Sequence, residues 1–174
     1  VGDEKKAIHL LENISYYRLS GYWFPLLSDK DNHTFKPSAN FDTAFKLYCF
    51  DRKLRSLVLS ELEKIEIAIR AKMIYVLSHE SGAFWFADPS IFSNTYSHNK
   101  TLQKIQDEFS RSDEEFIRSF KDNYNDPLPP AWILMEVVSL GSLSKLYQNL
   151  KPSKQKREIA NHFGVSDKVM ISWL

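Results

Sequence analysis

Apolar residues recur at helical spacing along a stretch from Phe41 to His79 that contains neither glycine nor proline. Placed at about 100° per residue, they share a broad arc, which is typical of a helix that faces a core. The arc residues are Leu47, Phe50, Leu54, Leu57, Val58, Leu62, Ile65, Ala68, Ile69, Met73 and Val76. Asn40 or Asp42 is placed to cap the first turn. The pattern predicts one long helix over about residues 41–79.

Charged residues interrupt and border this arc. Glu61 and Lys72 fall inside or beside it, which predicts a bend or a second polar partner there. One flank of the arc carries Arg52, Arg55, Glu63, Glu66 and Arg70, and the Glu66–Arg70 pair has the favourable i,i+4 order. Charges at the border between core and solvent are placed to pair with one another.

Shorter helical patterns precede and follow the long stretch. A first helix is expected from Asp3 to about Tyr17, with Asp3 as its cap. Beyond the long helix, two helical pieces are expected within residues 100–120, because residues 112–115 resemble a capping box that restarts a helix.

The last third of the chain also shows helical spacing. Residues 132–150 are expected to kink or split at Gly141–Ser142. Two short helices follow, the first ended by Gly164 and the second capped by Ser166. No β-type alternation of useful length is present in the sequence. The sequence therefore predicts an all-α fold, a helical bundle or array built around one long helix.

An aromatic cluster separates the first helix from the long one, between Tyr16 and Pro25. We interpret its rings as wedges between helices, because aromatic side chains bury a large area per residue. Stacking of nucleic-acid bases on these rings is the sharper alternative. His33 lies in the polar connection that follows and is expected to be a solvated loop residue.

Size and composition favour a single domain over residues 1–174, since 174 residues with 43% apolar and 14% aromatic content bury a core of ordinary size. The net charge of +1 argues against binding nucleic acid by bulk charge, although it leaves room for a local basic patch. The single cysteine, Cys49, fits a reducing compartment. Without a membrane-spanning run or a signal-peptide pattern, we expect a soluble, cytoplasmic protein.

Catalytic motifs are sparse. The sequence has no P-loop, no glycine-rich dinucleotide turn and no metal-binding cysteine or histidine cluster, so we expect no cofactor and no metal. A basic connection, Lys151, Lys154, Lys156 and Arg157, is either a solvated loop or a place for phosphate contacts. Arg157 and His162 also match the Arg-x4-His form of a helical ribonuclease motif. On a short helix ended by Gly164, this pair meets at one site only through side-chain reach or a second subunit.

Several motifs together resemble one known family. They are the Tyr16–Pro25 stretch, Leu47-Tyr48, Phe50-Asp51-Arg52, Leu54-Arg55, Ile65-Glu66, Arg70, Pro129-Pro130, Trp132, Glu136-Val137 and Gly141-Ser142-Leu143-Ser144. In this order they closely resemble the Abi-like abortive-infection proteins of bacteria, of the AbiD and AbiF type. The resemblance runs from about Tyr16 to Leu174.

The resemblance implies a bacterial anti-phage, toxin-like protein with a HEPN-like helical fold. In that family the Arg and His that cut RNA follow the helix that begins near Ile171. The chain ends at Leu174, in an unfinished helical pattern, so we expect it to stop before this motif. The resemblance does not place the catalytic role on Arg157 and His162. Arg52, Arg55, Glu66 and Arg70 match family positions, and their chemistry suits either a structural ion network or orientation of the missing Arg and His.

Two main hypotheses follow. The first is a metal-independent endoribonuclease that acts in phage defence when complete. The second is a non-catalytic module that binds RNA or protein through its basic segment and exposed aromatic residues. A purely structural helical dimer is a third. RNA is the expected partner, with an RNA or protein antitoxin beside it; a homodimer is implied by the resemblance alone, and no membrane association is expected.

Overall fold

The computed structural model describes residues 4–174, which form two compact units that divide between Glu63 and Lys64. The described residues contain nine α-helices, short 3-10 turns and one small hairpin. The predicted all-α class is confirmed. The expectation of a single domain over residues 1–174 stays a prediction.

The first unit begins with two short helices, α1 (Glu4–Ile14) and α2 (Tyr16–Ser20), where the sequence predicted one. The break lies at Ser15, whose φ of 68° is incompatible with a continuous right-handed helix. The Ser15 side chain then accepts a hydrogen bond from the Arg18 amide and caps α2. The predicted cap, Asp3, lies outside the described residues.

A small antiparallel hairpin follows α2 in the first unit. It pairs β1 (Leu27–Asp29) with β2 (Thr34–Phe35) after a 3-10 turn, η1 (Phe24–Leu26). The polar connection predicted here thus carries a short ladder that sequence periodicity did not indicate. Asp29 accepts hydrogen bonds from the two amides of residues 31 and 32, which closes the turn.

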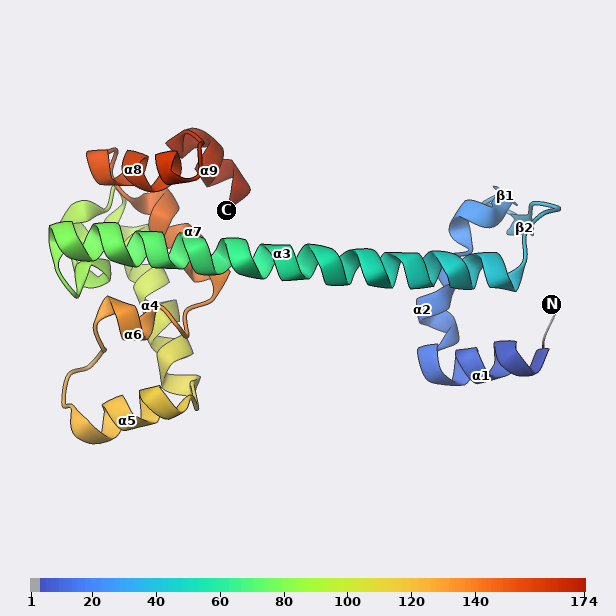
Figure 1. The fold of residues 1–174 in the computed structure, drawn as a ribbon, viewed down its shortest axis with the longest axis horizontal. Coiled ribbons are helices and arrows are strands. Elements are labelled where there is room, and N and C mark those ends of the chain that lie inside the picture. Colours follow the sequence, from blue (N-terminus) through green and yellow to red (C-terminus); the bar gives the residue numbers. More distant parts are fainter. Residues whose placement is uncertain (1–3) are drawn as a thin grey trace. The chain divides into compact units, whose positions relative to one another are not determined.

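The long helix, α3 (Phe41–Ser81), is present as predicted (Figure 1). Asn40 caps it, because its side-chain oxygen lies 2.8 Å from the Thr43 amide nitrogen. The prediction that its apolar arc faces a core is confirmed only near the C-terminal end, where Ile69, Met73 and Val76 are buried in the second unit. In the first unit Tyr48 is buried, but it lies outside the predicted arc, and the arc residue Phe50 is 64% exposed.

Between these buried positions, every residue of α3 from Arg52 to Ile65 is exposed. The expectation that Leu54, Leu57, Val58 and Leu62 face a core is therefore wrong. Periodicity reports which face of a helix is apolar, and it carries no information on whether another element of the chain covers that face.

The second unit packs its helices around one apolar core. After α3 come the 3-10 turns η2 (Trp85–Ala87) and η3 (Pro89–Ile91) and six helices: α4 (Thr95–Arg111), α5 (Glu115–Asn123), α6 (Ala131–Leu134), α7 (Leu140–Asn149), α8 (Lys154–His162) and α9 (Asp167–Trp173). Helix α7 packs on α4 and α9, and α9 also packs on α8. The largest fully buried side chains include Trp85, Phe86, Ile105, Leu143 and Tyr147.

The predicted break within residues 132–150 occurs earlier than expected. Helix α6 ends at Leu134 and α7 begins at Leu140, so Gly141–Ser142 lies inside the first turn of α7. Ser139 caps α7 by accepting a hydrogen bond from the Ser142 amide, 3.3 Å away. The predicted limits of the last two helices are confirmed, with Gly164 at φ +71° after α8 and Ser166 as the cap of α9.

None of the helices within residues 4–174 combines the length and the apolar character needed to cross a membrane.

Candidate functional site

In the first unit, the aromatic cluster meets the charged part of α3 through one hydrogen-bonded group. The Tyr22 hydroxyl donates to Asp51, and Arg55 Nη2 lies 3.0 Å from the same carboxylate. The Tyr22 ring packs edge-to-face on Tyr48, with ring centroids 5.5 Å apart. The hydrogen bond to Asp51, together with burial, raises the pKa of Tyr22. The Tyr16–Pro25 stretch and the Phe50-Asp51-Arg52 motif, which lie apart in the sequence, are therefore joined by this hydrogen bond.

The same part of α3 carries Arg55 and Arg52, two residues predicted to orient a catalytic pair. Arg55 pairs with Asp51 one turn earlier on α3 while about half of its side chain remains exposed. Arg52 is fully on the exposed surface of the helix. The role of both residues in orienting a catalytic pair stays a prediction.

In the second unit, Arg70 connects α3 to the segment between α6 and α7. Its Nη1 lies 2.9 Å from the Glu136 carbonyl oxygen, and its Nη2 lies 3.0 Å from that of Val138. Nη2 also lies 2.6 Å from Glu66 Oε1, so the predicted i,i+4 pair is present. Only 12% of the Arg70 side chain is exposed. These contacts form a structural network that joins Glu66 and Arg70 of α3 to the Glu136-Val137 motif.

The basic segment near α8 divides into one buried and three exposed residues. Lys156 is 5% exposed, and its ammonium group donates to the carbonyl oxygens of Gln148 and Leu150 at 2.9 and 2.8 Å. Burial lowers the pKa of Lys156. Its ammonium group is occupied inside the protein, so it is not placed to contact RNA. Lys151, Lys154 and Arg157 are exposed.

Arg157 and His162 both lie on α8 and are both exposed. Residues five positions apart on an α-helix point about 140° away from each other. His162 sits in the last turn, with its ring against Phe163 at 5.0 Å between centroids. Within one chain, the two side chains therefore do not converge on a common reacting atom.

A groove on α3 adds residues that the sequence did not single out. It is lined by Ala71, Ile74, Tyr75, Ser78, His79, Trp132 and Glu136. Tyr75 is 59% and Trp132 is 52% exposed, so both rings are available to a ligand. The ring of His79 stacks at an angle on Tyr75, with centroids 4.4 Å apart. Helical spacing alone gives no signal for such a groove, because its far wall comes from α6.

Lys72 places this groove beside the basic segment. Its Nζ lies 5.5 Å from the centre of the Tyr75 ring and 3.1 Å from Glu158 Oε1 on α8. The predicted polar partner of Lys72 is therefore Glu158, the residue next to Arg157. The aromatic groove and the exposed cations of α8 lie on adjoining parts of the second unit.

The aromatic cluster of the first unit is more exposed than predicted. Tyr16 is 62%, Tyr17 is 89% and Phe24 is 53% exposed, whereas Leu19 is fully buried. The wedge interpretation is wrong for these three rings, which line an open pocket together with Trp23 and His33. His33 itself is exposed, as expected for a solvated loop.

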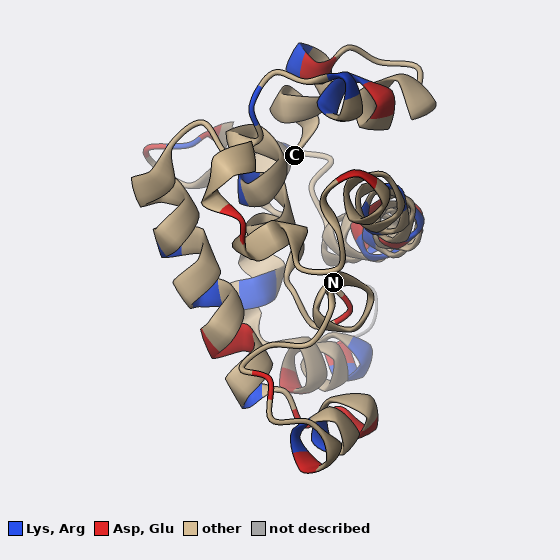
Figure 2. Ribbon diagram, turned by 90° about the vertical axis from the view of Figure 1, so that its left-hand side faces the viewer, with Lys and Arg blue, Asp and Glu red and all other residues tan. Residues whose placement is uncertain are grey.

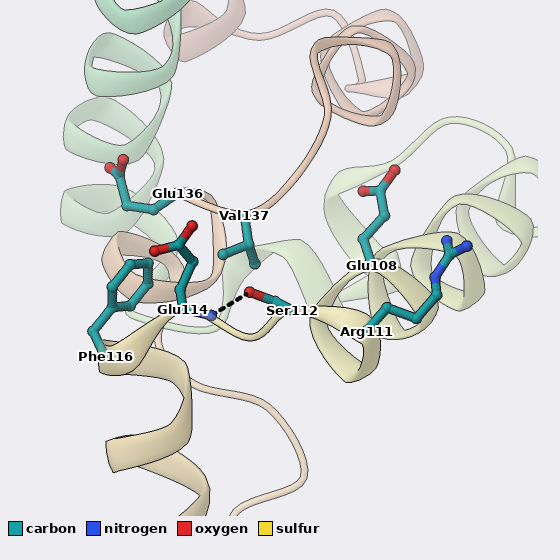
Figure 3. Close-up of a pocket in the computed structure, with 7 residues that line it drawn as sticks. All are labelled: Glu108, Arg111, Ser112, Glu114, Phe116, Glu136 and Val137. Atoms are coloured by element: carbon teal, nitrogen blue, oxygen red, sulfur yellow. Dashed lines mark hydrogen bonds between the residues drawn. The ribbon is translucent and has the colours of Figure 1, made fainter.

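A further pocket in the second unit has the wrong charge for a phosphate. Three glutamates and Arg111 line it, and Figure 3 shows Glu114 and Glu136 on one side of Val137 and Glu108 on the other. Glu108 is also engaged, because it accepts hydrogen bonds from the Ser139 and Ser142 hydroxyls at 2.7 and 3.1 Å. No group of three or more His, Cys, Asp or Glu residues within residues 4–174 is arranged to hold a metal ion.

Together these features define an all-α protein whose sequence motifs form one hydrogen-bonded network in each unit and whose second unit carries exposed cations and exposed aromatic rings. The chain belongs to the Abi-like protein family, whose model matches residues 9–174. The match covers nearly all of both units and places the chain among abortive-infection proteins, a group associated with phage resistance. No curated protein and no solved structure shows a significant match to this chain.

Proposed function

We propose that this protein defends bacteria against phage by acting on RNA, and that the second unit holds the RNA strand. Family membership supports the phage-defence part of the proposal. The observation that carries the RNA part is the adjoining position of exposed cations and exposed aromatic rings around Lys72.

This surface offers both kinds of contact that single-stranded RNA needs. Lys151, Lys154 and Arg157 supply positive charge for the phosphate backbone. Tyr75 and Trp132 supply ring faces on which unpaired bases stack. Basic residues stand beside acidic ones on α8 and α9, at the top of Figure 2. RNA binding is therefore local to this surface and does not come from a generally cationic protein.

The finer proposal is a metal-independent endoribonuclease of HEPN type. It acts as a toxin in the cytoplasm and is inhibited by an RNA or protein antitoxin. In such a reaction a general base accepts the proton of the ribose 2′-hydroxyl. The 2′-oxygen attacks the adjacent phosphorus, and the 5′-oxygen leaves with a proton from a general acid. A cation stabilises the charge that develops on the phosphate oxygens. Because Arg157 and His162 diverge on α8, we do not assign the cutting step to this pair within one chain.

Removing the three exposed cations of the basic segment, Lys151 and two residues of α8, tests the binding surface. A variant with Lys151→Ala, Lys154→Ala and Arg157→Ala is expected to bind single-stranded RNA at least about tenfold more weakly, because each lost phosphate contact forfeits counterion release. The slope of log affinity against log salt is expected to fall by roughly 2. Fluorescence anisotropy with a labelled oligoribonucleotide over a salt series measures both quantities.

The matched control replaces three exposed cations elsewhere in the same unit, with Lys100→Ala, Arg111→Ala and Arg118→Ala. Both variants lose the same charge, so an equal loss of affinity would reduce the effect to bulk electrostatics and contradict the proposed surface. Full affinity in the α8 variant would contradict it as well. Circular dichroism of both variants verifies that the helices remain folded.

The same RNA distinguishes the enzyme from the non-catalytic module. We expect the complete protein to cut RNA in the presence of a metal chelator, leaving a 2′,3′-cyclic phosphate that mass spectrometry detects. Tight binding without cutting would favour the module that binds RNA. Failure to bind RNA at all would favour a protein partner for the apolar Tyr75–Trp132 groove.

A further inference from the structure

The exposed part of α3 in the first unit carries more apolar surface than a solvated helix needs. Between Arg52 and Glu63 every residue is exposed, and the five large aliphatic side chains there are 46% to 68% exposed. They are Leu54, Leu57, Val58, Leu59 and Leu62. Scattered apolar residues are normal on surfaces, but a contiguous row of this kind marks an interaction surface.

The segment has an apolar face and a polar face. Leu54, Val58 and Leu62 are spaced by four, so they form one stripe about 80° wide. Leu57 and Leu59 lie on its two sides. The opposite face is polar and consists of Lys53, Ser56, Ser60 and Glu63. This segment is therefore amphipathic, and an amphipathic helix gains most of its stability by burying its apolar face.

The charges of the segment are arranged around Val58. Lys53 and Arg55 precede it, and Glu61 and Glu63 follow it; Arg52 and Lys64, six residues away on either side, are both basic. Arg55 and Glu61 each lie three residues from Val58, while Lys53 and Glu63 each lie five residues from it. The apolar stripe has the same symmetry, since Leu54 and Leu62 each lie four residues away.

We propose that this segment, residues 52–63 of α3, pairs with the same segment of a second copy of the chain in antiparallel orientation. A two-fold axis at Val58 sets Leu54 of each copy against Leu62 of the other. It also brings the basic end of each helix alongside the acidic end of its partner. A parallel pair would bring like charges together, which disfavours that orientation.

A second copy fits this surface better than the other occupants. The spacing of its apolar residues and the signs of its charges are both complementary to those of a second copy. An interface between identical copies related by a two-fold axis requires such self-complementarity. The segment is basic before Val58 and acidic after it, a pattern that matches a second antiparallel copy better than a uniformly anionic phosphate backbone or lipid surface. The pairing is independent of the RNA surface, which lies in the second unit.

A charge placed at the centre of the stripe tests the pairing. The protein is expected to form a dimer in sedimentation-velocity runs over a concentration series. Val58→Lys is expected to raise the dimer dissociation constant by at least about tenfold, because the axis brings the two new ammonium groups together in a desolvated contact. Since Val58 is exposed within each chain, circular dichroism should show unchanged helix content.

The matched control is Ser56→Lys, which adds the same charge to the polar back of the same helix. It is expected to leave the dissociation constant unchanged. A protein that is monomeric at every concentration, or a dimer that Val58→Lys and Ser56→Lys weaken equally, would overturn the proposal.

Disulfide trapping tests the orientation in a Cys49→Ser background. The double variant Leu54→Cys plus Leu62→Cys is expected to give linked dimers under oxidation. The reason is that the thiol at position 54 of each copy faces the thiol at position 62 of the other copy across the two-fold axis. Within one chain the two positions are two helical turns apart, about 12 Å, too far for an internal bond. Linked dimers from Leu54→Cys alone would show a parallel pair and overturn the antiparallel assignment.

Discussion

Replacing Lys156 by glutamate is expected to lower the free energy of unfolding by about 3–5 kcal/mol, the range seen when a buried charge loses its partners. The lysine ammonium group donates to the carbonyl oxygens of Gln148, in the last turn of α7, and of Leu150, directly after that helix. It also lies 5.4 Å from the centre of the Tyr147 ring, a cation–π contact. A carboxylate there would face two acceptors and the negative ring face, with no donor to satisfy it.

Lys154→Glu, two residues earlier on the same helix, is the matched control. Lys154 is exposed, so this substitution is expected to change stability by less than about 0.5 kcal/mol. Urea unfolding followed by circular dichroism measures both variants. Similar stabilities for the two variants would contradict the buried position of Lys156 and return it to the set of exposed cations available to RNA.

The contrast between Lys154 and Lys156 shows what sequence reasoning leaves undecided at a site. Both belong to one run of basic residues, and nothing in their order indicates which points inward. The direction depends on where Ser153 starts α8 and on how Ile159 and Ala160 dock that helix into the core. A change of one residue in the start of the helix would rotate another side chain into the same position.

The long helix shows the same limit at the level of the fold. Its extent was predictable because a run without glycine or proline, preceded by a capping asparagine, leaves little choice of local structure. Its burial was not predictable. Val58 and Met73 both belong to the predicted apolar arc, yet only Met73 is covered by other helices of the described chain. Which part of an apolar face is buried depends on tertiary packing.

The Tyr75–Trp132 groove could not be predicted from the sequence, for a further reason. Its two rings come from elements far apart in the chain, and the sequence offers no pairing signal between them. Lys72 was the one indication, since a lysine beside an apolar arc needs a polar partner. The structure identifies that partner as Glu158, and the contact connects the groove to α8.

Replacing Arg70 by methionine is expected to lower the free energy of unfolding by about 1–3 kcal/mol, because the substitution leaves partly buried acceptors without their donor. Methionine keeps most of the volume of the arginine stem, so the loss reports hydrogen bonding more than packing. The acceptors are the carbonyl oxygens of Glu136 and Val138, together with the Glu66 carboxylate. The connection between α6 and α7 is expected to become the first segment of the second unit to exchange its amide hydrogens.

Arg118→Met is the control, since 64% of the Arg118 side chain is exposed and its contact to Asp113 is a surface pair of 3.5 Å. It is expected to cost less than about 0.5 kcal/mol. The same Arg70 variant also separates an anchoring role from an orienting one. An anchor predicts that stability and RNA cleavage fall together. Normal stability with lost cleavage would show that the guanidinium group acts on the catalytic residues and that its carbonyl contacts contribute little to the fold.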